Sequence, residues 1–166
     1  MTTIAVKDGI MACDSQEGIH SDGGGDRAYY QCNKIYPIYS DNDDSELLYL
    51  IGCSGDSDGA PLFIEWFTDF YETEFCDKRI LKRMYEFDTE ALILHADGTI
   101  ETGSSFGIVH ECNEPFYAIG SGTKCALAAM HMGATAAEAV EIAKKIDPHT
   151  GGKVQVFEKA NGSTTS

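Results

Sequence analysis

Two Asp-Gly pairs, each between two short apolar runs, constrain the fold of this chain more than any other sequence feature. Asp8-Gly9 joins residues 3–7 to residues 10–14, and Asp97-Gly98 joins residues 91–95 to residues 99–102. An Asp-Gly pair readily adopts the positive backbone φ angles that the two-residue turn of a β-hairpin requires. The sequence therefore predicts antiparallel sheet near both ends of the chain's first 100 residues.

Strand-like and helix-like segments occur in blocks along the rest of the sequence. Apolar residues recur at helical spacing in 59–75, 123–132 and 135–146, and the last segment opens with Thr135 and Glu138, the pattern of a capping box. Further strands are expected at 34–38, 47–53, 106–111, 116–119 and 154–157, with a turn at 52–55 and irregular structure at 15–31 and 76–89. Pro37 predicts that 34–38 is an edge strand. Such blocks favour an α+β fold of antiparallel sheets covered by helices.

Length and charge limit the kinds of protein that this chain can be. Its 166 residues, 43% of them hydrophobic, predict one globular domain, taken as 1–159, followed by a flexible polar tail at 160–166. The formal net charge of −15 makes nucleic acid and anionic membrane surfaces poor partners. No apolar run approaches the length of a membrane span.

The cysteines point to a reduced protein without a metal site. The six cysteines are scattered, with no C-x-x-C pair, and no histidine stands at a metal-ligand spacing. The start of the sequence lacks the basic and apolar regions of a signal peptide. We therefore expect a cytoplasmic protein whose thiols mostly fill the core.

Thr2 is the first candidate for chemistry. Removal of Met1 is expected because the next residue is small, and it would leave a hydroxyl and a free α-amine on Thr2 at the start of the strand 3–7. The amine has a reference pKa of about 7.7–8.0, so near neutral pH part of it can accept a proton. A hydroxyl beside a base is an activated nucleophile. By position alone, the ordinary interpretation of Thr2 is a frayed chain end.

Six short motifs, in order along the chain, resemble those of proteasome β-subunits of the bacterial HslV type, within the N-terminal-nucleophile hydrolases. They are Thr2-Thr3-Ile4-Ala5-Val6, Ala12-Cys13-Asp14-Ser15-Gln16, Asn33-Lys34-Ile35, Gly52-Cys53-Ser54-Gly55, Ala118-Ile119-Gly120-Ser121-Gly122 and Asp147-Pro148-His149-Thr150-Gly151-Gly152. The resemblance extends from Thr2 to about Phe157. It implies a four-layer αββα sandwich, in which two antiparallel sheets lie between two layers of helices.

The resemblance also implies roles for seven residues in peptide-bond hydrolysis without a cofactor. The Thr2 hydroxyl would attack the scissile carbonyl, Lys34 would lower the pKa of the neighbouring amine, and Asp14 would hold Lys34 in place. The backbone N–H of Gly55 would stabilise the developing oxyanion. Three further residues would surround the N-terminus and hold the amine by hydrogen bonds: Ser121, Asp147 and Thr150.

The same resemblance assigns three residues to a substrate-binding pocket, namely Cys32, Cys53 and Ser57. Their small side chains would leave this pocket open. Asp56 and Asp58 would lie near its mouth, where two carboxylates would favour basic substrate side chains or repel acidic ones.

The implied partners are peptides or unfolded proteins, further copies in a homo-oligomeric ring, and an ATP-driven unfoldase. Two other functions stay open on the same fold. A chain that keeps Met1 would have a blocked nucleophile and would be a catalytically silent assembly subunit or scaffold. A closed, polar pocket would instead favour amide hydrolysis on a small molecule, as in other N-terminal-nucleophile enzymes.

Overall fold

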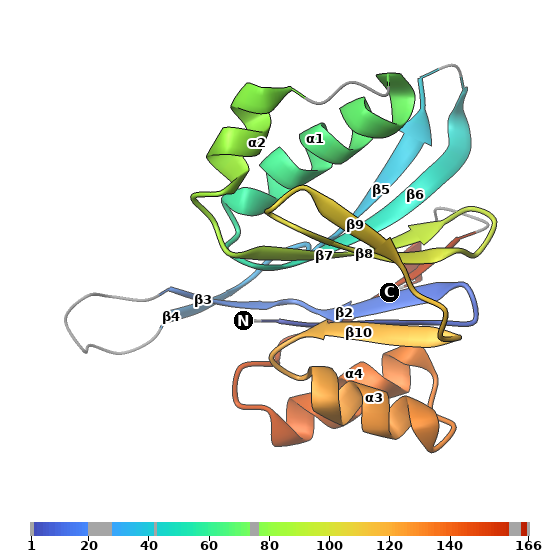
Figure 1. Cartoon of the computed structure of the whole chain (residues 1–166). Helices are drawn as coiled ribbons and strands as arrows, with labels where there is room; N and C mark the ends of the chain where they lie inside the picture. The colour runs from blue at the N-terminus through green and yellow to red at the C-terminus, as the bar shows by residue number, and fades with distance from the viewer. Residues whose placement is uncertain (1, 20–27, 42, 74–76, 160–163, 166) are drawn as a thin grey trace.

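Four layers make up the molecule, in the order helices, sheet, sheet, helices (Figure 1). A computed structural model of the chain describes residues 2–19, 28–41, 43–73, 77–159 and 164–165. Helices α1 (Gly59–Thr73) and α2 (Lys78–Met84) cover one outer face, and α3 (Thr123–His131) and α4 (Ala136–Ile146) cover the other. The expected αββα sandwich is confirmed.

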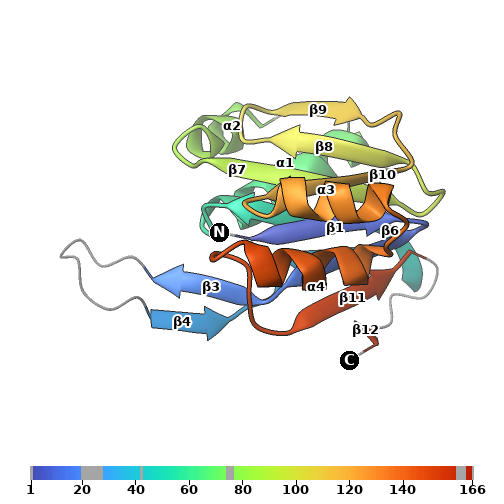
Figure 2. The same ribbon diagram turned by 90° about the horizontal axis from the view of Figure 1, so that it is seen from below.

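The first sheet contains the N-terminal strand. Its order is β10-β1-β2-β11-β12, formed by Phe116–Gly120, Thr3–Lys7, Ile10–Asp14, Val154–Glu158 and Thr164–Thr165. The turn between β1 and β2 places Asp8 and Gly9 at φ 53° and 74°, so the predicted hairpin is confirmed. β1 lies between β10 and β2, with α3 and α4 over this sheet (Figure 2). The start of the chain is therefore held on both sides.

The second sheet has the order β5-β6-β7-β8-β9, formed by Ile35–Ser40, Asp43–Gly55, Thr89–His95, Ile100–Ser104 and Ile108–Glu111. Pro37 lies in the edge strand β5, as predicted. The expected turn at 52–55 is wrong, because these residues continue β6 and pair with β7 as far as Gly55. Gly55 ends the strand at φ 95°, a conformation that favours glycine.

Successive side chains of β1 point to opposite faces of the first sheet and so enter two different parts of the core. Ile4 and Val6 join the apolar cluster between the two sheets, whereas Ala5 contacts the α3–α4 layer. Ala5 pairs with Ala12 on one side and with Ala118 on the other. These small side chains let the two helices lie close to the sheet.

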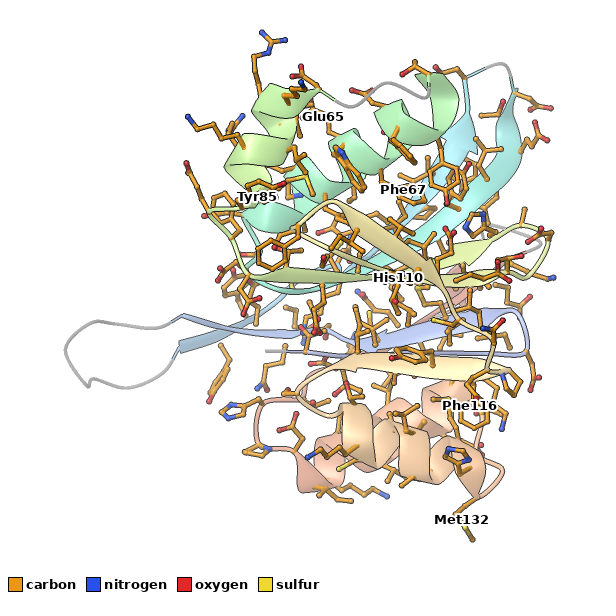
Figure 3. All side chains as sticks on the ribbon, viewed as in Figure 1. Glu65, Phe67, Tyr85, His110, Phe116 and Met132 are labelled. Carbon is orange, nitrogen blue, oxygen red and sulfur yellow. The ribbon has the colours of Figure 1, made fainter. Side chains whose placement is uncertain are left out.

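The helix layers follow the predicted periodicity. Phe67 of α1 is fully buried against the second sheet, whereas Met132, at the end of α3, is exposed on the opposite side of the molecule (Figure 3). The expected capping box opens α4: the Glu138 N–H donates to Thr135 Oγ1 at 3.2 Å, and the Thr135 N–H donates to the Glu138 carboxylate at 2.8 Å.

Two segments that were expected to be irregular form regular elements. Within 15–31, β3 (Gln16–Ile19) and β4 (Ala28–Gln31) pair as a two-stranded ribbon that projects from the body, and residues 20–27 lie outside the described residues (Figure 1). Within 76–89, α2 begins after Asp77, whose carboxylate accepts the Arg79 N–H at 2.8 Å. Residues 15–31 are poor in apolar residues, so backbone pairing specifies β3 and β4. In α2, by contrast, Ile80, Leu81 and Met84 pack against the apolar cluster that contains α1.

The expected flexible tail at 160–166 falls mostly outside the described residues. Within it, Thr164–Thr165 form β12 and pair with Val156 and Phe157 of β11. Cys76 also lies outside the described residues, and the five described cysteines are free thiols. No helix in the described ranges is long and apolar enough to cross a membrane.

Candidate active site

Thr2 is fixed at one end of the first sheet. It is only 5% exposed, and Thr3 directly after it pairs with Gly120 at the end of β10. Gly120 has φ 89°, and a Cβ atom there would lie 2.0 Å from the Thr2 carbonyl oxygen, so the close approach requires glycine. The Ser121 hydroxyl lies 3.3 Å from the same oxygen. The interpretation of Thr2 as a frayed end is therefore wrong.

Asp14 and Lys34 form a buried ion pair beside Thr2. Lys34 Nζ donates to Asp14 Oδ1 at 3.1 Å, and the two side chains are 5% and 0% exposed. Asp14 ends β2 in the first sheet and Lys34 precedes β5 in the second, so the pair connects the sheets. Lys34 Nζ also donates to the Gln16 carbonyl oxygen at 2.5 Å. Thr2 and Lys34 line the same small recess.

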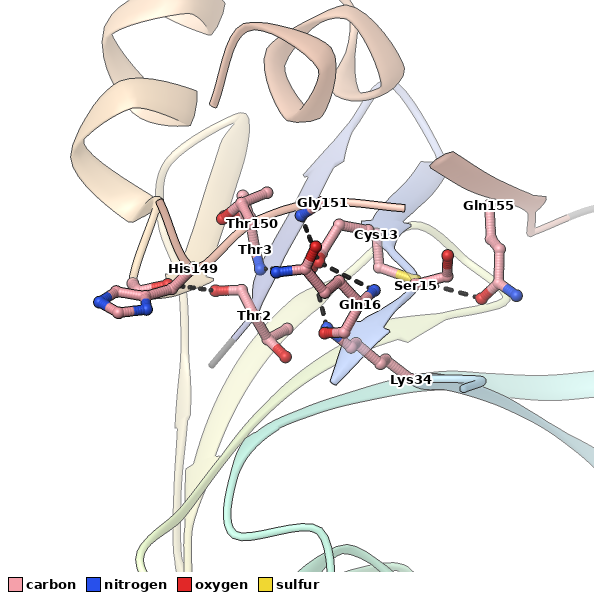
Figure 4. A network of polar contacts seen from close by, with 12 residues as sticks. Thr2, Thr3, Cys13, Ser15, Gln16, Lys34, His149, Thr150, Gly151 and Gln155 are labelled. Carbon is pink, nitrogen blue, oxygen red and sulfur yellow. Dashed lines mark hydrogen bonds and ion pairs between the residues drawn. The ribbon is translucent and has the colours of Figure 1, made fainter. Parts of the chain in front are cut away.

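Backbone donors hold the Asp14 carboxylate in place (Figure 4). Oδ1 accepts the Thr3 N–H at 2.8 Å in addition to Lys34, and Oδ2 accepts the N–H groups of Gly151 and Gln16 at 3.0 and 3.2 Å. A carboxylate with this many donors keeps one orientation. It can therefore position the Lys34 ammonium group.

A chain of hydroxyl groups links the N-terminal segment to Asp147, which follows α4. The Thr150 hydroxyl donates to Asp147 Oδ2 at 2.5 Å, so the Thr3 hydroxyl must donate to Thr150 across their 2.6 Å contact. The Ser121 hydroxyl lies 2.6 Å from Asp147 Oδ2. Partial burial raises the pKa of Asp147, but the hydrogen bonds from Ser121 and Thr150 outweigh it and leave this pKa below its ordinary value.

An open pocket of about 440 Å³ lies over Thr2. Gly55 contributes to its wall, and a Cβ atom at Gly55 would lie 1.9 Å from the Asp88 carbonyl oxygen. The pocket also contains Ser57 and Ser121. Polar atoms contribute more of the pocket's exposed lining than apolar atoms, so the pocket can form hydrogen bonds with a bound molecule.

A smaller recess of about 30 Å³ opens beside the pocket. All three residues assigned to substrate binding line it, together with Thr2 and Gly55: Cys32, Cys53 and Ser57. Burial raises the pKa of the Cys53 thiol to about 12, so this thiol is neutral at physiological pH.

The structure thus brings the predicted site residues to one end of the sandwich. Three predicted residues do not line the pocket or the recess but belong to the two hydrogen-bond networks: Asp14, Asp147 and Thr150. The remaining seven line the pocket or the recess: Thr2, Lys34, Gly55, Ser121, Cys32, Cys53 and Ser57. No group of histidine, cysteine or acidic side chains among the described residues could hold a metal ion.

Sequence reasoning missed Glu17, which lines both the pocket and the recess. It also missed Thr3 and Gly151 as backbone donors to Asp14. Glu17 stands three residues after Asp14, at the start of the segment that was expected to be an irregular loop. Residues 15–19 show no apolar alternation, so the sequence carried no signal for this position.

Comparisons with solved structures agree with this architecture. The chain superposes on HslV from Trypanosoma brucei with a TM-score of 0.62 at 18% identity, covering 95% of this chain and 98% of that chain. Anbu, an ancestral beta-subunit from Yersinia bercovieri, gives a TM-score of 0.70 at 10% identity, covering 99% and 86%. The Gly-1 mutant of Anbu from Hyphomicrobium sp. strain MC1 gives 0.69 at 11%, covering 100% and 86%.

At these identities the likeness establishes the fold, which is the one seen in HslV and Anbu. No protein-family model matches the sequence, and no curated protein sequence matches it. Any activity therefore has to be argued from the residues of this chain.

Proposed function

We propose that this protein is a threonine-type peptidase, in which Thr2 becomes the nucleophile once Met1 has been removed. The observation that carries the proposal is the position of Thr2, buried at the floor of an open pocket and beside the Lys34–Asp14 ion pair. A hydroxyl nucleophile needs a neighbouring base and a group that orients or tunes that base. The α-amine of Thr2 would be the base, and Lys34 would be the tuning group.

The reaction follows from these positions. The Thr2 hydroxyl attacks the scissile carbonyl while the Thr2 α-amine accepts its proton, directly or through a water molecule. The Lys34 ammonium group favours the neutral form of the nearby amine, because two positive charges at close range repel each other. Asp14 holds the Lys34 side chain in its orientation. The amine then returns the proton to the leaving nitrogen, and water hydrolyses the resulting ester on Thr2.

Oxyanion stabilisation is assigned to the backbone N–H of Gly55, which borders the pocket next to Thr2. Preorganised donors of this kind contribute about 3–4 kcal/mol in other hydrolases. Ser121, Asp147 and Thr150 act as positioning residues, because their hydrogen bonds reach Thr2 through its carbonyl group and through Thr3.

The shared fold supports proposals about assembly and substrate. We propose a single domain over 1–159, a homo-oligomeric ring around a chamber, peptide or unfolded-protein substrates, and a cytoplasmic ATP-dependent unfoldase as partner. The fold common to HslV and Anbu supports this context. The net charge of −15 opposes nucleic-acid or anionic membrane partners.

The test compares Thr2→Ala and Thr2→Ser with the unchanged protein, using fluorogenic peptides and size-exclusion chromatography. Thr2→Ala should abolish hydrolysis while the oligomer still forms, and Thr2→Ser should keep measurable activity because it keeps a hydroxyl. Thr68→Ala on α1 is the matched control, since the hydroxyl of this threonine donates to carbonyl groups of its own helix and the residue lies outside the pocket. Hydrolysis that survives Thr2→Ala would exclude the threonine mechanism.

A further inference from the structure

Glu17 lies where the pocket and the recess meet. It belongs to β3, pairs with Tyr30 of β4, and lines both spaces together with Thr2. The Cys32, Ser57 and Tyr30 side chains lie close enough to its carboxylate to lower its pKa by hydrogen bonding. Glu17 therefore places a negative charge next to the proposed nucleophile.

The charge of Glu17 persists at neutral pH. Burial raises its pKa, but the hydrogen bonds from Cys32, Ser57 and Tyr30 and the nearby Lys34 together hold this pKa below its ordinary value. Lys34 is itself buried and already bonded to Asp14 and to the Gln16 carbonyl group. The ammonium group is therefore directed at Asp14 rather than into the open pocket.

All the charged residues in the wall of the larger pocket are acidic. Among the residues that line it, four carry carboxylates and none is a lysine or an arginine: Glu17, Asp56, Asp88 and Glu90. The Asp56 carboxylate accepts the Asp88 N–H at 3.0 Å, so one of its oxygens already forms a hydrogen bond within the fold. Glu17 and Asp56 also line the recess, and of these two only Glu17 has no backbone N–H hydrogen bond among the described contacts.

We propose that Glu17 selects substrates with a lysine or arginine side chain next to the scissile bond, which makes it a specificity-determining residue of the site. This inference rests on the proposed peptidase function. The recess holds little more than one water molecule, so a long side chain lies mainly in the larger pocket and ends near the junction. At that junction its cation reaches the Glu17 carboxylate, which lines both spaces.

The test uses three fluorogenic peptides that differ only in the residue on the amino side of the scissile bond: lysine, leucine or glutamate. The unchanged protein should cleave the lysine peptide with the highest kcat/KM and the glutamate peptide with the lowest. Glu17→Gln should lower the lysine-to-leucine ratio of kcat/KM about tenfold, because a charge-assisted hydrogen bond is lost. Glu65→Gln removes the same charge from the exposed face of α1, far from the site (Figure 3), and should leave that ratio within about twofold.

The outcomes separate this inference from the function on which it rests. Equal cleavage of the lysine and leucine peptides, or an unchanged ratio in Glu17→Gln, would overturn the specificity assignment and leave the peptidase intact. If no peptide is cleaved and a threonine-directed peptide vinyl sulfone does not label Thr2, both the proposed peptidase function and the specificity assignment are wrong.

Discussion

Replacing Lys34 by Met tests the buried ion pair without relying on activity. Met is close to lysine in shape but carries no charge, so the change leaves Asp14 without its cation. Both side chains are buried, at 5% and 0% exposure, and the N–O distance is 3.1 Å. Removing one partner of such a pair costs about 3–5 kcal/mol. The backbone donors of Thr3, Gln16 and Gly151 remain, which favours the lower end of this range.

A loss of about 3 kcal/mol corresponds to a fall in Tm of roughly 6–12 °C for a chain of this size. Urea unfolding at fixed protein concentration measures the free energy directly. Lys145→Met, at an exposed position of α4, is the matched control and should change stability by less than about 0.5 kcal/mol.

The double variant Lys34→Met/Asp14→Asn decides whether the two side chains act as a pair. It removes both charges, so its cost should fall short of the sum of the two single costs by about 1 kcal/mol or more. Costs that add within about 0.5 kcal/mol would refute the coupling, and with it the role of Asp14 in holding Lys34.

Three further predictions concern the N-terminal segment and helix α4. Gly120→Ala should destabilise the fold and lower peptidase activity, because its Cβ atom would lie 2.0 Å from the Thr2 carbonyl oxygen; thermal unfolding and peptide hydrolysis measure both effects. Thr135→Ala removes the capping box of α4 and should cost about 1 kcal/mol in urea unfolding while activity persists. Asp147 contributes stability above the pKa of its unfolded state, and this contribution is lost as pH falls through its lowered folded pKa. Asp147→Asn should therefore flatten the acidic side of the stability–pH profile, and an unchanged profile would contradict the role given to its hydrogen bonds with Ser121.

The fold could be predicted from sequence where local chemistry and the apolar pattern agree. Asp8-Gly9 has one favoured turn, and the strands on either side of it alternate between two buried faces. The segment 15–31 was predicted wrongly because little in its apolar pattern marks it. The segment 76–89 was predicted wrongly because its charged residues obscured the helical spacing of Ile80, Leu81 and Met84. The pairing of β3 with β4 depends on backbone hydrogen bonds, and no particular residue type predicts them.

The candidate site likewise contains residues that the sequence predicts and one that it does not. Thr2, Asp14 and Lys34 stand in motifs whose spacing matches a known arrangement, so their meeting could be foreseen, although Asp14 and Lys34 come from different sheets. The position of Glu17 could not be foreseen, because it depends on β3 extending beyond the end of β2 and turning its carboxylate toward the recess. Such a position follows from the three-dimensional arrangement of the strands.

Intact mass spectrometry, with and without a threonine-directed peptide vinyl sulfone, tests the central proposal most directly. The account predicts a native protein that has lost the mass of Met1 and gains a single adduct, mapped to Thr2 by peptide fragmentation and absent from Thr2→Ala. A protein that retains Met1 and gains no adduct would contradict the proposed nucleophile, and a silent assembly subunit would then be the better description of this chain.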